Sequence, residues 1–323
     1  MMPLVSVSCI TYNHENYIRQ ALDSFLEQEC SFGYEIIIHD DASTDATPDI
    51  IREYAEKYPD IIKPMLQSEN QYSRGISNIS GVYNFPRALG KYIAMCEGDD
   101  FWCDPHKLAG QAAYMEAHPD TALCCHAAKT LAMDGAYRSS DEIHPYHETR
   151  QLTAAEVISK PVNFPTASMF FRTEYARTLP EWYFNCPVGD IPLQLYMLSK
   201  GNVYYDDTVM SVYRMGAGGS WSSGMDDDKA REKWERHYVQ MKDLFEAFDR
   251  DTMGRYSSAV NDAIRRNRFL IDIKEGSREA VLDPANAAYL GELPDTERRL
   301  LKLKAHHPFV YGALQKTYRK FSG

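Results

Sequence analysis

Acidic residues gather at the end of an apolar run in the first half of the chain. Residues 92–104 read Tyr-Ile-Ala-Met-Cys-Glu-Gly-Asp-Asp-Phe-Trp-Cys-Asp, so Glu97, Asp99 and Asp100 directly follow a run with strand character. Carboxylates this close repel one another and lose hydration unless a divalent cation or a cationic ligand lies among them. The pattern therefore predicts a metal site. An alternative stays open, in which Asp99 or Asp100 only caps the following helix.

A second acidic group follows another apolar run nearer the N-terminus. Residues 35–47 read Glu-Ile-Ile-Ile-His-Asp-Asp-Ala-Ser-Thr-Asp-Ala-Thr, and this run ends in Asp40 and Asp41, with Ser43 and Asp45 close behind. In an open α/β sheet, ligands bind beyond the carboxyl ends of the strands, so we expect both acidic groups to face one crevice. Together they predict a site for a nucleotide and its metal.

The elements that must position these residues alternate between strand and helix. Apolar spacing predicts early strands at 4–10, 35–39, 61–66 and 92–96, and later ones at 122–129, 167–172, 203–205 and 209–214. Helical spacing recurs between them, including a helix over 190–200. This alternation predicts an α/β fold with a mainly parallel sheet flanked by helices.

Composition limits the class of protein. The 323 residues are 44% hydrophobic and 25% charged, which is ordinary for a soluble globular chain, and the net charge of −11 argues against nucleic acid as a partner. The seven cysteines lack the paired spacing of zinc ribbons or disulfide modules. No signal peptide or run of roughly 20 apolar residues is evident. We therefore expect a cytoplasmic protein.

The C-terminal third has a different, all-helical pattern. Residues 1–224 are predicted to form one α/β domain and residues 225–323 a helical appendage. Its last segment, 297–321, mixes leucines and aromatic residues with arginines and lysines. A basic amphipathic tail of this kind suits peripheral contact with the inner face of the cell membrane. The favoured alternative, because it is the more common case, is a helix that packs its apolar side against its own domain.

One loop-like segment carries histidines. Residues 134–150 are polar and turn-rich, and they include His144 and His147. Two histidines could bind a metal, but an exposed loop is the favoured interpretation because no acidic or cysteine partner lies nearby at a diagnostic spacing.

Three motifs in order resemble the family-2 glycosyltransferases of the GT-A fold, over about the first 220 residues. They are residues 5–28, the acidic run 40–45, and Glu97-Gly98-Asp99-Asp100, in which a glutamate replaces the usual first aspartate. The resemblance implies a site for a nucleotide-diphosphate sugar made by Thr11, Tyr12, Asn13, Asp40, Asp41, Ser43, Asp45 and Asp99. It also implies that Mg²⁺ or Mn²⁺ is held by Asp99 and Asp100.

The resemblance extends to later residues with catalytic or binding roles. Asp190 occupies the place of the catalytic base at the start of a later helix, with a helix cap as the alternative. Arg214 lies in the segment that closes over the diphosphate in relatives, although the histidine that often follows it is absent. Trp102 and Trp221 are the candidate platforms for the sugar or acceptor, with packing as the alternative for Arg214 and Trp221.

These roles imply an inverting single displacement. A divalent cation would act as Lewis acid on the leaving diphosphate, and Asp190 would deprotonate the acceptor hydroxyl. We expect a UDP-sugar donor and a glycan or lipid-linked glycan acceptor, in surface polysaccharide or glycolipid assembly. Two alternatives stay open: a Mg²⁺-dependent phosphoaspartate receiver module, and an inactive protein that binds a nucleotide sugar without transferring it.

Overall fold

A ten-stranded sheet forms the centre of the computed structural model, which describes residues 2–132, 142–159, 164–216 and 230–309. The order is β3-β2-β1-β4-β9-β6-β10-β5, with β7 beside β6 and β8 beside β10. The strands are β1 (Val5–Thr11), β2 (Tyr34–Asp40), β3 (Ile62–Leu66), β4 (Tyr92–Met95), β5 (Phe101–Trp102), β6 (Thr121–Ala132), β7 (Glu142–Ile143), β8 (Arg150–Leu152), β9 (Phe170–Arg172) and β10 (Asn202–Met215).

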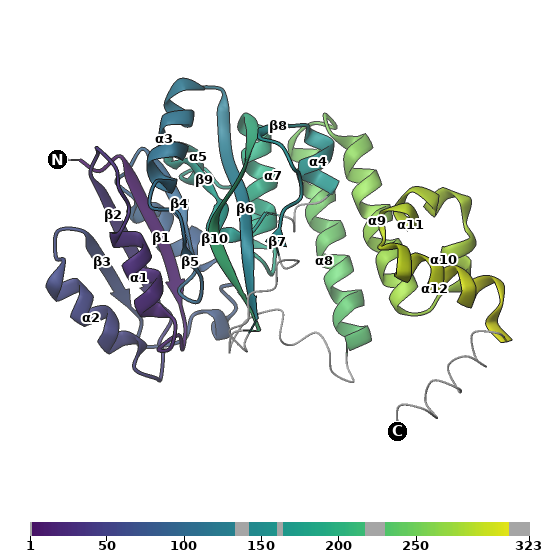
Figure 1. The fold of residues 1–323 in the computed structure, drawn as a ribbon, viewed down its shortest axis with the longest axis horizontal. Coiled ribbons are helices and arrows are strands. Elements are labelled where there is room, and N and C mark those ends of the chain that lie inside the picture. Colours follow the sequence, from purple (N-terminus) through teal and green to yellow (C-terminus); the bar gives the residue numbers. More distant parts are fainter. Residues whose placement is uncertain (1, 133–141, 160–163, 217–229, 310–323) are drawn as a thin grey trace.

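Helices cover the sheet and continue beyond it (Figure 1). Those in the first 216 residues are α1 (Ile18–Leu26), α2 (Thr47–Lys57), α3 (Lys107–Ala117), α4 (Ala154–Ser159), α5 (Thr173–Ala176), α6 (Glu181–Phe184) and α7 (Asp190–Lys200). The later ones are α8 (Ala230–Asp251), α9 (Ser257–Lys274), α10 (Arg278–Leu282), α11 (Ala287–Glu292) and α12 (Asp295–His306).

The N-terminal half of the sheet is parallel, and its strands β1, β2 and β4 are almost wholly buried, whereas β3 at the edge is partly exposed. Strand β1 pairs in parallel with β2 and β4, and β2 pairs in parallel with β3. The register places Thr11 opposite Asp40, so the carboxyl ends of β1 and β2 coincide. Because parallel strands end at one edge of a sheet, the polar residues that follow β1, β2 and β4 open onto the same edge.

The other half of the sheet is mixed. Strand β9 runs antiparallel to both β4 and β6, β6 and β10 are parallel, and β5 is antiparallel to β10. The prediction of two separate strands at 203–205 and 209–214 was wrong, because β10 is one continuous strand. Its register shifts between Asp206 and Ser211, so an irregularity absorbs the polar residues that had suggested a break.

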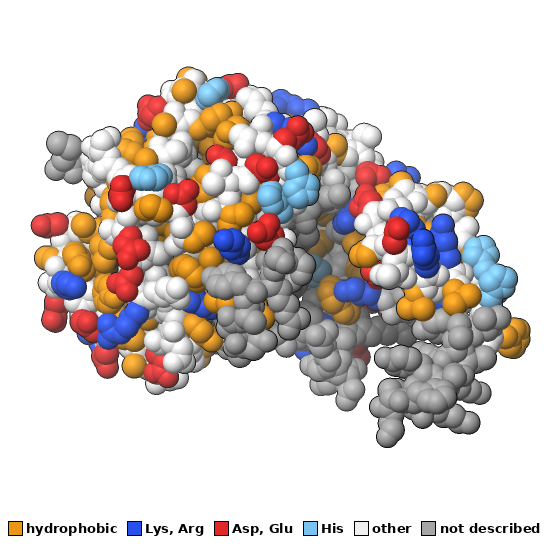
Figure 2. All heavy atoms as spheres, viewed as in Figure 1, with side chains coloured by type: hydrophobic (Ala, Val, Ile, Leu, Met, Phe, Trp, Pro, Cys, Tyr) orange, Lys and Arg blue, Asp and Glu red, His pale blue; other side chains and the backbone are white. Residues whose placement is uncertain are grey.

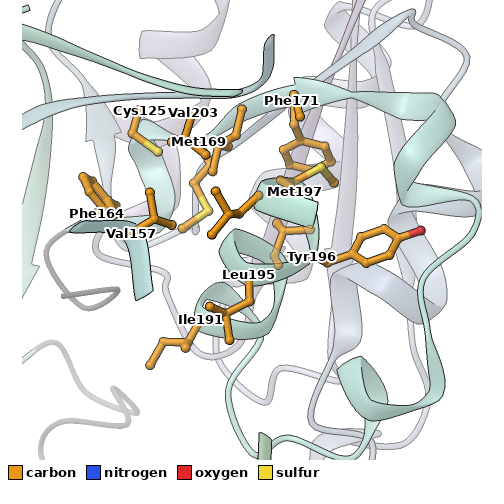
Figure 3. Packing of buried hydrophobic residues seen from close by; sticks show 14 of the residues in the cluster. Cys125, Val157, Phe164, Met169, Phe171, Ile191, Leu195, Tyr196, Met197 and Val203 are labelled. Atoms are coloured by element: carbon orange, nitrogen blue, oxygen red, sulfur yellow. The ribbon is translucent and has the colours of Figure 1, made fainter. Parts of the chain in front are cut away.

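The helices after β10 share the core of the sheet. Met241, Phe245 and Phe248 of α8 and Val260 of α9 are buried in the same hydrophobic cluster as the residues of α7. Figure 3 shows part of that cluster, with Leu195 and other α7 side chains against the sheet. Helices α10 to α12 instead close a small cluster of their own against the end of α9. The predicted division at 224/225 falls outside the described residues.

The basic C-terminal segment is described only as far as residue 309. In α12, Ala305 is buried and Leu301 packs against the cluster formed with α10, whereas Leu300 is 52% exposed. The buried side of α12 agrees with the interpretation that this helix packs against its own domain. Within the described residues, no helix is both long enough and apolar enough to cross a membrane.

A lysine side chain lies wholly inside the core below the sheet. The Nζ of Lys107 lies 4.3 Å from the centroid of the Trp102 ring and donates a hydrogen bond of 2.8 Å to Gln111 Oε1. Burial lowers the pKa of Lys107 to about 7. Because an ammonium is costly in such a place, the folded state releases this proton more readily than the unfolded chain does.

We expect Lys107→Met to remove one source of pH-dependent stability. Between the folded pKa of about 7 and the ordinary value near 10.4, the unfolded chain binds more protons than the folded one, so stability rises with pH. From about pH 7.5 to 8.5 the free energy of unfolding of the unsubstituted protein should rise by about 1 kcal/mol more than that of the variant. Urea unfolding at both pH values measures the difference, and parallel profiles would contradict the expectation.

Candidate active site

The loops after β1 and β2 are joined by hydrogen bonds at the edge of the sheet. The backbone N–H of Asn13 donates to Ser43 Oγ at 2.8 Å, and Asn13 Oδ1 accepts from the Thr44 N–H at 2.8 Å. Asn13 has a φ of +56°, a left-handed conformation that asparagine tolerates better than most residues. The structure therefore brings the predicted residues of the first two motifs together.

The acids after β2 are engaged in shaping these loops. Asp40 accepts hydrogen bonds from the Ser43 N–H at 3.1 Å and from the Ser43 hydroxyl at 2.5 Å. Asp41 accepts from the backbone N–H groups of Gln71 at 2.8 Å and Tyr72 at 3.0 Å. Their nucleotide-binding role remains a prediction, whereas the hydrogen bonds show that they fix the loops at this edge of the sheet.

The side chain of Asp45 is occupied by hydrogen bonds to the loops, whereas the side chain of Tyr12 is exposed. Asp45 accepts from the backbone N–H groups of Glu15 at 3.0 Å and Thr47 at 2.9 Å, and so links the β1 loop to the start of α2. Tyr12 is 38% exposed. An aromatic side chain exposed at this edge can stack on a flat ring.

Glu97, Asp99 and Asp100 form a compact acidic cluster after β4. Each offers a carboxylate oxygen, and these oxygens lie within 4.8 Å of one another. The cluster is held against the end of β1, because the Gly98 N–H donates to the Ile10 carbonyl at 2.9 Å. A Cβ on Gly98 would lie 2.7 Å from Thr11 Oγ1, so only glycine allows this close approach.

The charge and hydrogen bonding of this cluster fit a divalent cation. Burial raises the pKa of Glu97 and of Asp100 well above the usual range, and the Asp99 carboxylate adds to both shifts. The Oδ2 atom of Asp100 is buried without a hydrogen-bond partner among the described residues. A set of carboxylate oxygens alone suits a hard cation such as Mg²⁺ or Mn²⁺. These residues therefore fit the predicted metal.

Arg214, at the end of β10, holds the acidic loop in place. Its backbone N–H donates to Asp100 Oδ1 at 2.8 Å. Its guanidinium lies 4.9 Å from the ring centroids of both Tyr17 and Phe101, and it donates to the Asp99 carbonyl and to the Gln20 side chain. The predicted diphosphate contact is untested, but these contacts make Arg214 a positioning residue for the cluster.

We expect Arg214→Lys to weaken metal use more than it weakens folding. A lysine cannot stack between two rings while donating in two directions, so Asp99 and Asp100 would lose their fixed geometry. The apparent affinity for Mn²⁺ in donor hydrolysis should fall by about 10- to 100-fold. This is the usual loss when a residue that orients the metal ligands, without binding the metal itself, is replaced. Arg52→Lys is the matched control, because Arg52 is exposed and its ion pair in the described structure is with Asp49 on the same helix. Equal Mn²⁺ titrations for both variants would contradict this role.

Asp190 is the first residue of α7 and acts electrostatically on one acid of the cluster. Its carboxylate is near enough to Glu97 to contribute to the raised pKa of that residue, after burial and the two neighbouring aspartates. Burial also raises the pKa of Asp190 itself, and its Oδ1 accepts from the Ile191 N–H at 2.8 Å. This effect on Glu97 is consistent with a base near the candidate metal site, and the catalytic role of Asp190 stays a prediction.

Asn78 fixes the loop that leads to Asp190. Its side-chain amide donates to the carbonyls of Tyr183 at 2.7 Å and Cys186 at 3.1 Å. A Cβ on Gly189 would lie 2.8 Å from Asn78 Oδ1, so the segment before Asp190 packs directly on this side chain. Sequence reasoning missed Asn78, since the polar segment around it carries no motif.

His14 is a second residue that sequence reasoning missed. Its Nε2 lies 3.9 Å from Asp99 Oδ2, and its Nδ1 is buried without a hydrogen-bond partner among the described residues. Burial lowers the pKa of His14, which favours the neutral ring. The signal that could have found it is its position directly after Thr11-Tyr12-Asn13 in the first motif.

The two tryptophans proposed as sugar platforms have different outcomes. Trp102 is only 3% exposed, its ring lies 4.7 Å from that of Phe25, and its Nε1 donates to the Ala167 carbonyl at 3.2 Å. The platform prediction for Trp102 is therefore wrong, because β5 turns this side chain into the core. Trp221 lies outside the described residues.

Comparison with known proteins identifies the class. Residues 6–178 match the sequence profile of Glycosyl transferase family 2. The chain belongs to this family and is a glycosyltransferase. The phosphoaspartate receiver alternative is therefore not favoured.

Two curated relatives show how far the similarity extends. An uncharacterized protein of Mycobacterium tuberculosis is 35% identical over 317 residues, which cover 94% of this chain and 80% of the relative. This match includes most of the helical region after β10. The putative teichuronic acid biosynthesis glycosyltransferase TuaG of Bacillus subtilis is 37% identical over 113 residues, covering 35% of this chain and 42% of TuaG.

Solved structures confirm the GT-A fold. S. aureus TarS 1–349 in complex with UDP-GlcNAc matches with a TM-score of 0.56 and 19% identity, covering 98% of this chain and 91% of that chain. This chain covers 55% of a longer TarS structure. The mannosyltransferase PcManGT of Pyrobaculum calidifontis, in complex with GDP-Man and Mn²⁺, matches with a TM-score of 0.56 and 17% identity, covering 100% and 81%.

Proposed function

We propose that this glycosyltransferase moves a sugar from a UDP-sugar, with inversion, to a hydroxyl group of a glycan or lipid-linked glycan. The observation that supports this most strongly is the position of Asp190 at the first residue of α7, where its carboxylate is near enough to Glu97 to contribute to the raised pKa of that residue. A base placed opposite a metal-binding cluster suits direct attack by an acceptor hydroxyl. No second nucleophile on the sugar side is needed for such a displacement.

Each group of residues has a distinct task in this proposal. Asp99 and Asp100 would hold Mg²⁺ or Mn²⁺, which supplies Lewis-acid stabilisation of the leaving diphosphate when bound. Asp190 accepts the proton of the acceptor hydroxyl at its carboxylate, and its raised pKa makes it a stronger base than an ordinary aspartate. Arg214 holds the acidic loop in a fixed position through its hydrogen bonds to Asp99 and Asp100.

The nucleoside would lie at the joined loops after β1 and β2. Tyr12 offers the exposed ring for stacking on the base, and Asn13 and Asp41 fix the walls around it. Thr11, Asp40, Ser43 and Asp45 support these walls from behind. This assignment extends the sequence prediction and rests on the contacts among the loops.

Relatives and neighbours support the choice of donor and acceptor. The TarS structure contains UDP-GlcNAc and the PcManGT structure contains GDP-Man with Mn²⁺, and both have the fold of this chain. TuaG is named for teichuronic acid biosynthesis, which suits assembly of a surface polymer. The basic segment 297–321 would bring the enzyme to the inner face of a membrane that carries such an acceptor.

A donor screen tests the proposal. Binding and hydrolysis of UDP-, GDP- and dTDP-sugars are measured with Mn²⁺, with Mg²⁺ and with a chelator, using Asp49→Ala as the control for a surface aspartate that is 81% exposed. Metal-dependent hydrolysis of a UDP-sugar is the expected result, and proton NMR of the transferred sugar should show an inverted anomeric centre. Binding without turnover would favour the inactive nucleotide-sugar-binding protein, and absence of any binding would overturn the proposal.

A further inference from the structure

A second group of potential metal ligands lies outside the candidate active site. His144, His147 and Asp207 each offer one ligand atom, and these atoms lie within 4.8 Å of one another. Asp207 precedes Arg214 by seven positions on β10, so this group is roughly 20 Å along the strand from the acidic cluster. Figure 2 shows histidine side chains beside acidic ones near the middle of the viewed face.

The segment that carries both histidines is anchored to the sheet at its two ends. Strand β7 pairs with β6 through Ile143 and Ala128, and β8 pairs with β10 through Arg150 and Tyr205. Between these anchors, the Tyr146 ring packs edge-on against Tyr205, with centroids 5.6 Å apart. The loop is thus short, closed and attached to the strand that bears Asp207.

Asp207 is itself fixed by the irregular part of β10. The register between β6 and β10 shifts between Asp206 and Val209. The backbone N–H of Asp207 donates to Thr149 Oγ1 at 2.9 Å, which joins this irregularity to the histidine-bearing segment. Bulges re-aim side chains, and here the result is a carboxylate directed at His144.

The two ring nitrogens of His144 face different carboxylates. Its Nε2 contacts Asp207, whereas its Nδ1 lies 3.4 Å from Glu142 Oε2. A metal-bound histidine commonly has one nitrogen on the ion and donates its other N–H to a carboxylate, which orients the ring. Glu142 is placed for that outer role, so the cluster contains both ligands and the partner that orients one of them.

The donor set selects a different ion from that of the active site. Two imidazoles and one carboxylate suit Zn²⁺ or a similar first-row transition ion, whereas the oxygen-only cluster of Glu97, Asp99 and Asp100 suits Mg²⁺ or Mn²⁺. Three protein ligands leave a fourth position for water or an outside ligand. The competing explanation is an ion pair between a protonated His144 and Asp207, which needs neither His147 nor a metal.

We propose that His144, His147 and Asp207 bind one Zn²⁺-type ion, which fastens the loop between β7 and β8 to the irregular part of β10. The site is separate from the catalytic metal site and does not depend on the proposed function. Its expected contribution is a gain in thermal stability on metal binding, because an ion that binds only the folded state stabilises it.

Cobalt binding tests this proposal directly. The tag-free full chain, stripped with a chelator, is titrated with Co²⁺ alone and followed by visible absorption, and a parallel thermal-unfolding series uses Zn²⁺. We expect one saturable Co²⁺ site with a tetrahedral-type spectrum and a rise in Tm with Zn²⁺. His147→Ala should lower the affinity for Co²⁺ by more than about 100-fold. Replacing a residue that only orients a metal ligand lowers the affinity by less than this.

Three further variants make the result decisive. Asp207→Asn should lose the spectrum, and Asp99→Ala should keep it, because that change affects only the active-site cluster. His307→Ala is the matched control, since His307 is also exposed and lies in the helical region. His147 is exposed, so its replacement should leave the Tm of the metal-free protein unchanged. The same Co²⁺ affinity in His147→Ala as in the unsubstituted protein, or no saturable site at all, would overturn the proposal.

Discussion

Asp99→Ala should abolish metal-dependent donor hydrolysis and sugar transfer, with kcat/KM reduced by about 10³-fold or more. The reason is that a Lewis acid contributes several kcal/mol to stabilisation of the leaving diphosphate, and this stabilisation requires an ordered ligand set. Arg214 fixes Asp99 through the Asp99 backbone carbonyl. Within the described part of the chain, the Asp99 carboxylate lies 3.9 Å from His14 and close to the other two acids of the cluster. The measurement is the initial rate over a range of donor concentrations, which gives kcat/KM, repeated over a Mn²⁺ titration.

The same variant should fold normally, which separates catalysis from stability. Among the residues that the structure describes, none donates a short hydrogen bond to the Asp99 side chain, so its loss should shift the Tm little. Asp49→Ala should change neither rate nor Tm. Retention of most of the activity in Asp99→Ala would mean that Glu97 and Asp100 hold the metal without it, or that transfer does not use the cluster.

Asp190→Asn should reduce kcat for transfer by about 10²- to 10⁴-fold, the usual contribution of a general base. The KM for the donor and the apparent affinity for Mn²⁺ should stay within a few-fold of the unsubstituted enzyme, because Asp190 lies on the acceptor side in the proposed mechanism. The kcat and KM are obtained separately from transfer assays with the donor that the screen identifies.

This substitution also tests the alternative in which Asp190 only caps α7. The N-cap of α7 is Gly189, and Asp190 is the first residue of the helix. Asparagine keeps the side-chain oxygen that accepts from the Ile191 N–H, so the variant should keep most of the stability of the helix while losing the base. An unchanged kcat would assign Asp190 to the helix cap alone. A large fall in Tm together with kcat would instead show that its buried carboxylate is needed for folding.

Local patterns predicted the parts of the site that follow regular elements. The ends of β1, β2 and β4, and the start of α7 at Asp190, lie where apolar periodicity changes to polar sequence. The convergence of these ends on one edge follows from the rule for parallel strands and needed no further information. The α/β fold with its site at one sheet edge is therefore accessible from local patterns, whereas the GT-A fold and the assignment to the glycosyltransferases came from the resemblance of three motifs to that family.

Long-range contacts set what local patterns could not predict. Trp102 was predicted to be a platform for the sugar or acceptor, but β5 pairs with β10 and turns the ring towards Phe25. His144 and His147 had no acidic partner at a diagnostic spacing, and Asp207 reaches them only because β7 and β8 bring that loop to β10. The role of Asn78 depends on a loop that follows it by more than 100 positions.

The shared core of α7, α8 and α9 determines which part of this chain can be exchanged as a unit. Met241, Phe245 and Phe248 complete the interior against which α7 packs, and α7 carries Asp190 at its first position. A chimera joined directly after β10 would expose that interior and loosen the helix that presents the base. Recombination with relatives should therefore keep α8 and α9 together with the sheet, and place any junction after the end of α9.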